Sequence, residues 1–269
     1  MALFNRLLEI LKTPMEVPKP YSWFHLLFWV LSIGFAILLC VTHKKGDDKR
    51  VRRVVFVTAV IVILFELYKQ IVYNFTGGEE ITFKYQWYIF PWQFCSIPMY
   101  VGLLTGFFRK GRVHNALCAF LATYAMFAGL CVMVYPSDVF IRYIGINIQT
   151  MVCHGSMIVV AIYLLYTQYV KLNHKTMLAA MSVFAVALGI ALLLNEVVYR
   201  VGLPEGEVFN MFFVSPHFAG TLPLYSLVQA VLPFPVCVFI YFTIFSVAAY
   251  LILLVAMLVK KVFARKEQA

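Results

Sequence analysis

Charged residues are scarce in this sequence, and their scarcity argues against a soluble protein. Only 13% of the 269 residues are charged, 63% are hydrophobic, and the mean hydropathy is +0.87. Soluble domains carry about 25% charged residues, so the composition fits a bilayer as solvent. The net charge of +10 is spread over short loops between apolar runs, where basic residues set topology and contact anionic headgroups. The sequence therefore predicts a polytopic membrane protein that binds no nucleic acid.

Several motifs of soluble enzymes and secreted proteins are missing as well. The chain has no glycine-rich nucleotide-binding motif, no GxSxG nucleophile elbow and none of the close ligand spacings of metal sites. Six cysteines are present, but none forms a CxxC pair or a cluster in a loop. We therefore expect free thiols, no metal and no cofactor. No short apolar run with a small-residue cleavage site opens the chain, so no cleaved signal peptide is expected.

Apolar runs fill most of the chain, and seven of them approach the length of about 20 residues that crosses a bilayer. We expect an all-α fold, a bundle of seven transmembrane helices. The predicted spans are residues 22–41, 54–73, 88–108, 115–135, 141–166, 177–199 and 234–259. Residues 1–12 repeat Leu and Phe at helical spacing, which is typical of an amphipathic helix on a membrane surface. Residues 1–20 are thus predicted to be a surface segment and residues 21–260 the membrane domain.

Lysine and arginine gather in alternate loops. The first, third and fifth loops hold Lys44, Lys45, Lys49, Arg50, Arg52 and Arg53, then Arg109, Lys110 and Arg112, then Lys171 and Lys175. Because basic loops are retained in the cytoplasm, these three loops are predicted to lie there. The N-terminus is then outside, and residues 261–269 form a basic cytoplasmic tail. The expected location is the cell membrane, specifically a bacterial plasma membrane, which the chain crosses several times.

The last outer loop, about residues 200–233, is too long and too apolar for a plain connector. Pro216, Gly220 and Pro223 prevent a regular eighth span. We expect this loop to dip back into the membrane as a lid. Phe213 is predicted to help cover a site between the third, fifth and sixth spans.

The third predicted span carries a polar cluster that lipid crossing does not require. Pro91 and Pro98 interrupt it, and Gln93, Cys95 and Ser96 lie between them. A proline inside a helix leaves the carbonyl four residues earlier without its partner, so the bend is typical of a site. Counted at 1.5 Å per helical residue from the interfacial aromatics, the Cys95 thiol is expected about 10 Å inside the bilayer.

One histidine, His154, lies well inside a predicted span. The third and fifth spans run in the same direction, so Cys95 and His154 are expected to share the outer half of the membrane. Each residue also has a structural interpretation, because a buried cysteine is commonly a small core residue and a lone histidine can be a satisfied packing residue. Cys153 precedes His154 but falls on another face of the helix. Gln93, Ser96 and the two prolines lie close to Cys95 in the sequence, and this polar, interrupted context favours Cys95 as the functional thiol.

Four further polar residues lie within or at the ends of predicted spans. Glu66 and Lys69 are three residues apart, on one helical face, where they can neutralise each other or contact a substrate headgroup. Asn195 and Glu196 come near the outer end of the sixth span. There they can orient a neighbouring imidazole or simply reach for water, and both interpretations stay open.

Three stretches of this sequence resemble the YwaF-like family of small bacterial integral membrane proteins, whose animal relative is transmembrane protein 164. They are FPWQFCSIP in the third predicted span, CHG in the fifth, and the region from LLLNEVVYR to NMFF after the sixth. The resemblance extends over about residues 66–226. It implies a cysteine-dependent transfer of fatty acyl chains between phospholipids, with Cys95 and His154 at the positions of the functional cysteine and histidine.

The hypothesis from the sequence is a membrane-embedded phospholipid acyltransferase. It would hold a fatty acyl chain as a thioester on Cys95 and pass it to a lysophospholipid or a similar acceptor, with His154 as base. Phospholipids and lysophospholipids are the expected partners. The alternative is a non-catalytic transporter or lipid-binding membrane protein, in which Glu66 and His154 relay protons.

Overall fold

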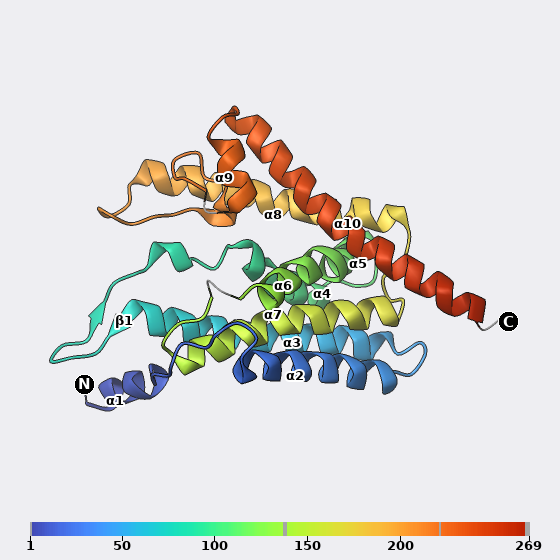
Figure 1. Ribbon diagram of the computed structural model, residues 1–269, viewed down its shortest axis with the longest axis horizontal. Coiled ribbons are helices and arrows are strands. Elements are labelled where there is room, and N and C mark those ends of the chain that lie inside the picture. The colour runs from blue at the N-terminus through green and yellow to red at the C-terminus, as the bar shows by residue number, and fades with distance from the viewer. Residues whose placement is uncertain (1, 137–138, 221, 267–269) are drawn as a thin grey trace.

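The structure, a computed structural model, describes residues 2–136, 139–220 and 222–266 and is built mainly of helices (Figure 1). Six helical stretches within these residues are long and apolar enough to cross a membrane. They are α2 (Trp23–Val41), α3 (Asp48–Asn74), the continuous run of α5 (Arg112–Phe120), η3 (Leu121–Ala125) and α6 (Met126–Val134), α7 (Ile144–Tyr166), α8 (His174–Val201) and α10 (Phe234–Lys266). The chain is thus an all-α polytopic membrane protein. Residues 267–269 of the predicted tail lie outside the described residues.

The third predicted span, residues 88–108, is not one continuous helix. The chain passes through two 3-10 turns, η1 (Trp87–Ile89) and η2 (Phe94–Ser96), before α4 (Ile97–Phe107) begins. Pro91 in the interval between the turns has no N–H to donate, whereas Pro98 occupies the first turn of α4, where that N–H has no partner to lose. The helical part of this segment is therefore shorter than a full membrane span.

This segment nevertheless runs the whole length of α3. At one end, β2 (Thr82–Phe83) pairs antiparallel with β1 (Phe75–Thr76), which directly follows α3. At the other end, Arg52 in the second turn of α3 donates a hydrogen bond to the carbonyl of Gly106, at 3.0 Å. The segment therefore crosses the bundle first as irregular chain and then as helix. A count of seven membrane passages stays a prediction.

The N-terminal helix α1 (Ala2–Leu11) lies against the β1–β2 hairpin. The Asn5 amide donates to the Gly78 carbonyl at 2.8 Å, and the Lys12 ammonium donates to the Phe75 carbonyl at 2.6 Å. Leu8 is buried, whereas Leu3, Leu7 and Ile10 remain exposed. Because these three residues recur at helical spacing, the helix presents an apolar stripe of the kind that lies on a membrane surface.

The basic loops meet at one end of the bundle. The Lys110 ammonium and the Asp48 carboxylate form an ion pair at 2.6 Å, which joins the third loop to the first. Lys260 of α10 donates to the Gln168 side chain in the fifth loop, also at 2.6 Å. These contacts agree with the sidedness that the positive-inside rule predicts, although they do not identify the compartment.

Reporter fusions test that orientation. A reporter after Asp47 is expected to lie in the cytoplasm and one after Glu80 outside, because the loop around Asp47 is rich in lysine and arginine and the loop around Glu80 is not. Fluorescence of a green fluorescent protein fusion, which needs the cytoplasm, and activity of an alkaline phosphatase fusion, which needs the outside, give opposite readouts. The reverse pattern would invert the predicted topology.

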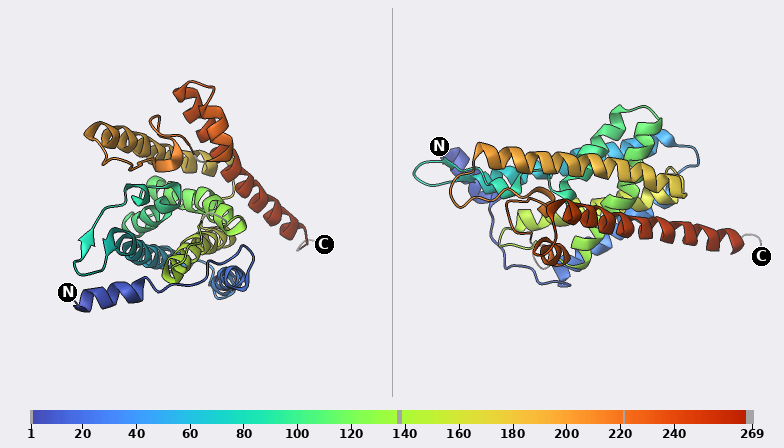
Figure 2. Two further views of the ribbon diagram at one scale, coloured as in Figure 1. Left: turned by 60° about the vertical axis from the view of Figure 1, so that its left-hand side comes forward. Right: turned by 90° about the horizontal axis from the view of Figure 1, so that it is seen from above.

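Helix α7 lies in the interior, with α1 and α2 toward one side of the molecule and α8 and α10 toward the other (Figure 2). Two glycines allow its close packing. A Cβ atom on Gly155 would lie 2.2 Å from the Ser32 hydroxyl of α2, and one on Gly129 of α6 would lie 2.7 Å from the His154 carbonyl. Small residues at such positions let helix backbones approach each other in membranes. The backbone around His154 is therefore held from two sides.

Aromatic rings connect α8 to the broken third segment. Phe184 of α8 is fully buried, and its ring centroid lies 5.6 Å from that of Phe94 and 4.5 Å from that of Tyr124. The Trp92 indole also donates to the Ala187 carbonyl, at 3.2 Å. Aromatic pairs of this kind add roughly 0.5–1.5 kcal/mol each beyond their buried area. They fix the residues directly before Cys95 against the middle of α8.

Candidate functional site

The place of Cys95 in the bundle is defined by the packing of its neighbours, whereas its depth in the membrane stays a prediction. The predicted depth of about 10 Å assumed a helical rise of 1.5 Å per residue, but the chain before η2 is not continuous helix. Its neighbour Phe94 packs on Phe184, and Trp92 bonds to Ala187, both in the middle part of α8. Cys95 itself is partly buried and packs against the main hydrophobic core. The chain directly before the thiol therefore lies against the middle part of α8.

His154 of α7 is 8% exposed, and its ring has a defined tautomer. Its Nδ1 atom lies 2.7 Å from the Thr150 carbonyl oxygen. A carbonyl oxygen only accepts, so Nδ1 carries the hydrogen and Nε2 of the neutral ring holds the free electron pair. Among the described residues, Nε2 has no hydrogen-bond partner although it is buried. An unpaired acceptor of this kind is costly in an apolar interior and is suited to take up a proton.

Cys95 and His154 belong to neighbouring parts of the interior. Cys95 belongs to the turn η2, and His154 belongs to α7. The turn η2 contacts α6, and α6 packs along α7. Within the described residues, however, no hydrogen bond joins the Cys95 thiol to the His154 ring. A catalytic pair of Cys95 and His154 therefore stays a prediction.

Glu66 and Lys69 form an ion pair inside the bundle. The Lys69 Nζ atom lies 2.8 Å from Glu66 Oε2, and Glu66 is 8% exposed. The Gln70 amide donates to the other carboxylate oxygen at 2.8 Å and to the Ile89 carbonyl of η1 at 3.0 Å. The pair is thus neutralised across one helical turn and tied to the broken third segment. Gln70 was not among the predicted residues, although its place four residues after Glu66 is visible in the sequence.

Gln93 and Asn195 hold the outer loop from two directions. The Gln93 side chain donates to the Asn210 carbonyl at 3.0 Å and accepts from the Phe212 N–H at 2.9 Å. The Asn195 side chain donates to the Met211 carbonyl at 3.0 Å and accepts from the Met211 N–H at 2.7 Å. Both amides are therefore engaged with the backbone of the loop, and they act as clamps on its short turn η4 (Met211–Phe213).

The clamped turn η4 is strained. Phe212 and Phe213 have φ values of 59° and 57°, in the left-handed region that costs a residue with a side chain of order 1 kcal/mol or more. The Phe212 ring is fully buried, 5.8 Å from that of Phe94 and 6.2 Å from that of Phe184. Phe213 is partly buried. The loop thus inserts an aromatic side chain beside η2, where the predicted lid would act.

Removing the Asn195 clamp is expected to destabilise the protein. Asn195→Ala leaves the buried N–H of Met211 without its partner and removes the shorter of the two hydrogen bonds to the Met211 carbonyl, which still accepts from the Val214 N–H at 3.4 Å. One unsatisfied buried group costs about 1–3 kcal/mol. The matched control is Asn173→Ala on the same helix, which removes only the cap on Thr176 N–H and costs about 1 kcal/mol. Thermal unfolding in detergent measures both variants. An Asn195 variant no less stable than the Asn173 variant would show that the clamp contributes little.

Of the remaining predicted residues, Ser96 lies in the interior and Glu196 lies at the outer end of α8. Ser96 is buried directly after Cys95, and its N–H donates to the Gln93 carbonyl at 2.8 Å. Glu196 lies at the outer end of α8, where it binds Arg200 and accepts from His217 Nε2 at 2.7 Å. The His217 ring in turn stacks on Tyr199 with centroids 3.5 Å apart. Glu196 therefore stabilises the surface of the outer loop rather than contacting the interior around His154.

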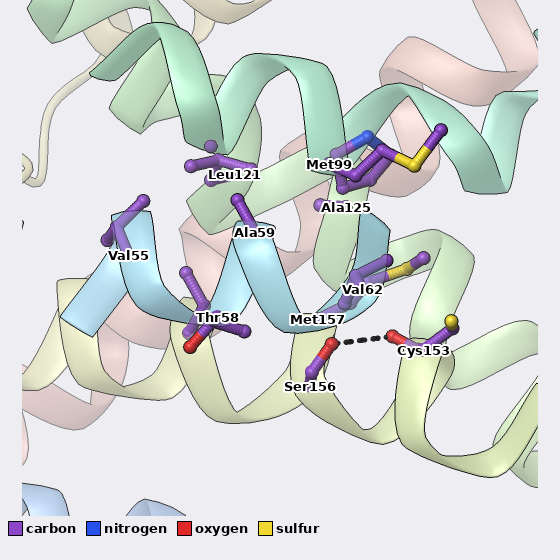
Figure 3. A pocket seen from close by; sticks show the side chains of 13 residues that line it. Val55, Thr58, Ala59, Val62, Met99, Leu121, Ala125, Cys153, Ser156 and Met157 are labelled. Atoms are coloured by element: carbon purple, nitrogen blue, oxygen red, sulfur yellow. Dashed lines mark hydrogen bonds between the residues drawn. The ribbon is translucent and has the colours of Figure 1, made fainter. Parts of the chain in front are cut away.

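A narrow apolar cavity of about 30 Å³ lies between α3, α4, η3 and α7 (Figure 3). Cys153 lines it at the end where Val62 and Met99 also lie, so Cys153 faces this cavity from the helix that carries His154. The π-helical turn η3 supplies Leu121 and Ala125 to the wall. Such π-turns are frequent at functional sites, but nothing in the sequence of this span indicated one.

All six cysteines are free, as the sequence predicted. In the part of the chain that the structure describes, no group of three or more His, Cys, Asp or Glu side chains is arranged to hold a metal ion. The polar side chains of the interior include the Glu66–Lys69 pair, the thiols of Cys95 and Cys153, and the His154 ring.

Comparison with known proteins gives one match. A family model described as the TMEM164 family matches residues 20–261, which include the whole predicted membrane domain. No curated protein matches the sequence, and no solved structure matches it. The matched range contains every candidate residue described above.

Proposed function

We propose, since the chain belongs to the TMEM164 family, that this multi-pass membrane protein is a cysteine-dependent phospholipid acyltransferase. Cys95 is the proposed nucleophile and His154 its general base. The observation that carries the proposal is the free Nε2 electron pair of His154, buried and without a partner among the described residues. Nδ1 anchors the ring to α7, so the electron pair of Nε2 is left to take up a proton.

The first half of the reaction forms a thioester. The Cys95 sulfur attacks the carbonyl carbon of a phospholipid ester, and the thiol proton moves to His154 Nε2. The ester C–O bond then breaks, and His154 returns the proton to the departing oxygen of the lysophospholipid. A neutral thiol beside a neutral imidazole is the proposed resting state, because separated charges would be costly at this depth.

The second half transfers the acyl chain. The hydroxyl of a second lysophospholipid gives its proton to His154 Nε2 and attacks the thioester carbon. The C–S bond breaks, and the Cys95 sulfur regains the proton. Hydrolysis competes whenever water reaches the thioester, so the buried Phe212 and the clamped outer loop support transfer by covering η2.

Intact-mass spectrometry of the purified protein tests this function. Incubation with phosphatidylcholine vesicles is expected to add the mass of one fatty acyl chain, and hydroxylamine, which cleaves thioesters, should remove it. Peptide mapping should place the adduct on Cys95. If lysophosphatidylcholine is acylated while no adduct ever forms on a cysteine, the thioester mechanism is wrong.

The Glu66–Lys69 ion pair favours a second candidate, a non-catalytic carrier or lipid-binding protein. Ionisable residues inside a membrane domain often mark a transport pathway. Both groups are paired with each other, however, and Glu66 accepts a further bond from Gln70, which is as compatible with a structural role. Solute flux into proteoliposomes without any covalent change to lipid or protein would support the carrier.

A further inference from the structure

We propose that the apolar cavity between α3, α4, η3 and α7 is the binding site for the acyl chain of the phospholipid donor, and that its length selects the chain. This inference rests on the proposed function, since it gives the chain carried by Cys95 a place to lie. The first support is position. Pro98, Met99 and Gly102 line the cavity, and they follow Cys95 by three, four and seven residues.

Residues at this spacing lie on one face of a helix. Since Phe94–Phe107 is one apolar helical stretch, the thiol and these three lining residues are aligned along it. The cavity therefore begins about one turn below Cys95. Cys153 lines the same end from α7, where it packs with Val62 and Met99.

The second support is the shape and chemistry of the cavity. Its α3 wall runs from Val62 to Val55, seven residues, or about 10 Å at the helical rise of 1.5 Å per residue. Figure 3 shows Val62, Met99 and Cys153 together at one end, with Val55 and Leu121 at the other. An apolar cavity tends to stay dry and to accept apolar ligands. A chain attached at Cys95 would enter beside Met99 and point toward Val55.

The third support is the balance of small and flexible residues in the walls. Gly102 faces Ala59 so closely that a Cβ atom on the glycine would lie 2.8 Å from the Ala59 Cβ. Because Gly102 and Ala59 are small and in close contact, this part of the wall is rigid. Met99 and Met157 are the flexible parts, because an unbranched thioether changes rotamer at low cost. Their displacement lets the narrow cavity of about 30 Å³ widen around an acyl chain.

Two polar groups of the α7 wall are already satisfied. Ser156 of α7 donates its hydroxyl hydrogen to the Cys153 carbonyl at 2.8 Å, and Cys153 accepts a contact from the Gln149 amide at 3.4 Å. Neither group therefore requires water in the cavity, which is a condition for an apolar occupant.

The test is photo-labelling with a phosphatidylcholine that carries a diazirine in its acyl chain, incorporated in vesicles with the full-length protein. Labels are expected on the peptides of Met99 and Met157. Ser156→Leu, which adds a branched side chain to the wall, should lower this labelling by about tenfold, the low end of the cost of one misplaced methylene in an apolar pocket. Thr58→Leu fills the opposite wall on α3 and serves as the second variant if Ser156→Leu does not fold.

The matched control is Ser182→Leu. Ser182 of α8 is exposed, and its hydroxyl bonds to the carbonyl three residues earlier at 2.8 Å, as that of Ser156 does. Its labelling should equal that of the wild type. Labels confined to exposed helix faces, or labelling equal in the Ser156→Leu, Thr58→Leu and Ser182→Leu variants, would overturn the inference.

The same experiment in a Cys95→Ala background separates this inference from the proposed function, because labelling of the cavity needs no thioester. When a thioester forms on the wild-type protein, the mass of the adduct gives the length of the bound acyl chain. Ser156→Leu should shift it toward shorter acyl chains in vesicles of mixed chain length. An adduct without this shift would still support the acyltransferase function, but it would show that the cavity does not select the length of the acyl chain.

Discussion

The Cys95→Ala variant is expected to lose acyl transfer by roughly 10³-fold or more, because the thioester cannot form at this position without the sulfur. The variant should insert and fold normally. The side chain is only partly buried, and the packing of its neighbours Phe94 and Trp92 does not depend on the sulfur. Transfer of a radiolabelled acyl chain to lysophosphatidylcholine by the purified protein measures the loss.

Cys131→Ala is the control for this variant. Cys131 is exposed on α6, outside the proposed site, and its replacement should leave transfer unchanged. A melting temperature of Cys95→Ala close to that of the wild type would show that the loss is chemical rather than structural. Full transfer by the Cys95→Ala protein would exclude the mechanism and leave the carrier as the better interpretation.

The broken third segment could be located from the sequence, but its extent could not. Pro91 and Pro98 indicated an interruption, because neither donates the hydrogen bond that a continuous helix needs. The length of the irregular stretch depends on partners far along the chain. The Gln93 side chain is satisfied by the backbone of Asn210 and Phe212, and the Trp92 indole by Ala187. No local pattern around Pro91 contains these partners.

The outer loop illustrates the same limit. Its proline and glycine content predicted a segment that is not a regular span, and η4 is indeed irregular. The left-handed backbone at Phe212 and Phe213 is unpredictable, since a bulky residue rarely adopts it unless its surroundings enforce it. Asn195 supplies part of that enforcement from within a long helix by binding the Met211 backbone. Its sequence context suggested either the orientation of a nearby imidazole or contact with water.

The sequence predicted which residues belong to the candidate site, but it did not predict the distances and hydrogen bonds between them. The helical spacing of Glu66 and Lys69 allowed either an ion pair or a contact with a substrate headgroup, and the structure contains the ion pair. The tautomer of His154 was not predictable, because it is decided by the distance from Nδ1 to the Thr150 carbonyl. That distance leaves Nε2 as the reactive atom, and it turns a histidine that could have been a packing residue into a candidate base.

The His154→Ala variant is therefore expected to lose nearly all transfer, also by roughly 10³-fold, because no group then accepts the thiol proton or returns it to the leaving oxygen. His154→Gln keeps most of the side-chain volume between α6 and α7 but lacks a basic nitrogen, so it should be about as inactive as the alanine variant and more stable. His174→Ala, at the exposed start of α8, is the control and should stay active.

Combining the two site variants gives the decisive comparison. If Cys95 and His154 act as one unit, the Cys95→Ala/His154→Ala double variant should be scarcely less active than either single variant, since removing the second member of a unit costs little more. A second readout is the rate at which a membrane-permeant maleimide alkylates Cys95, which should fall in His154→Gln because the base no longer assists loss of the thiol proton. Losses that multiply in the double variant, together with an unchanged alkylation rate, would mean that His154 acts independently of the thiol and that its free Nε2 serves another step.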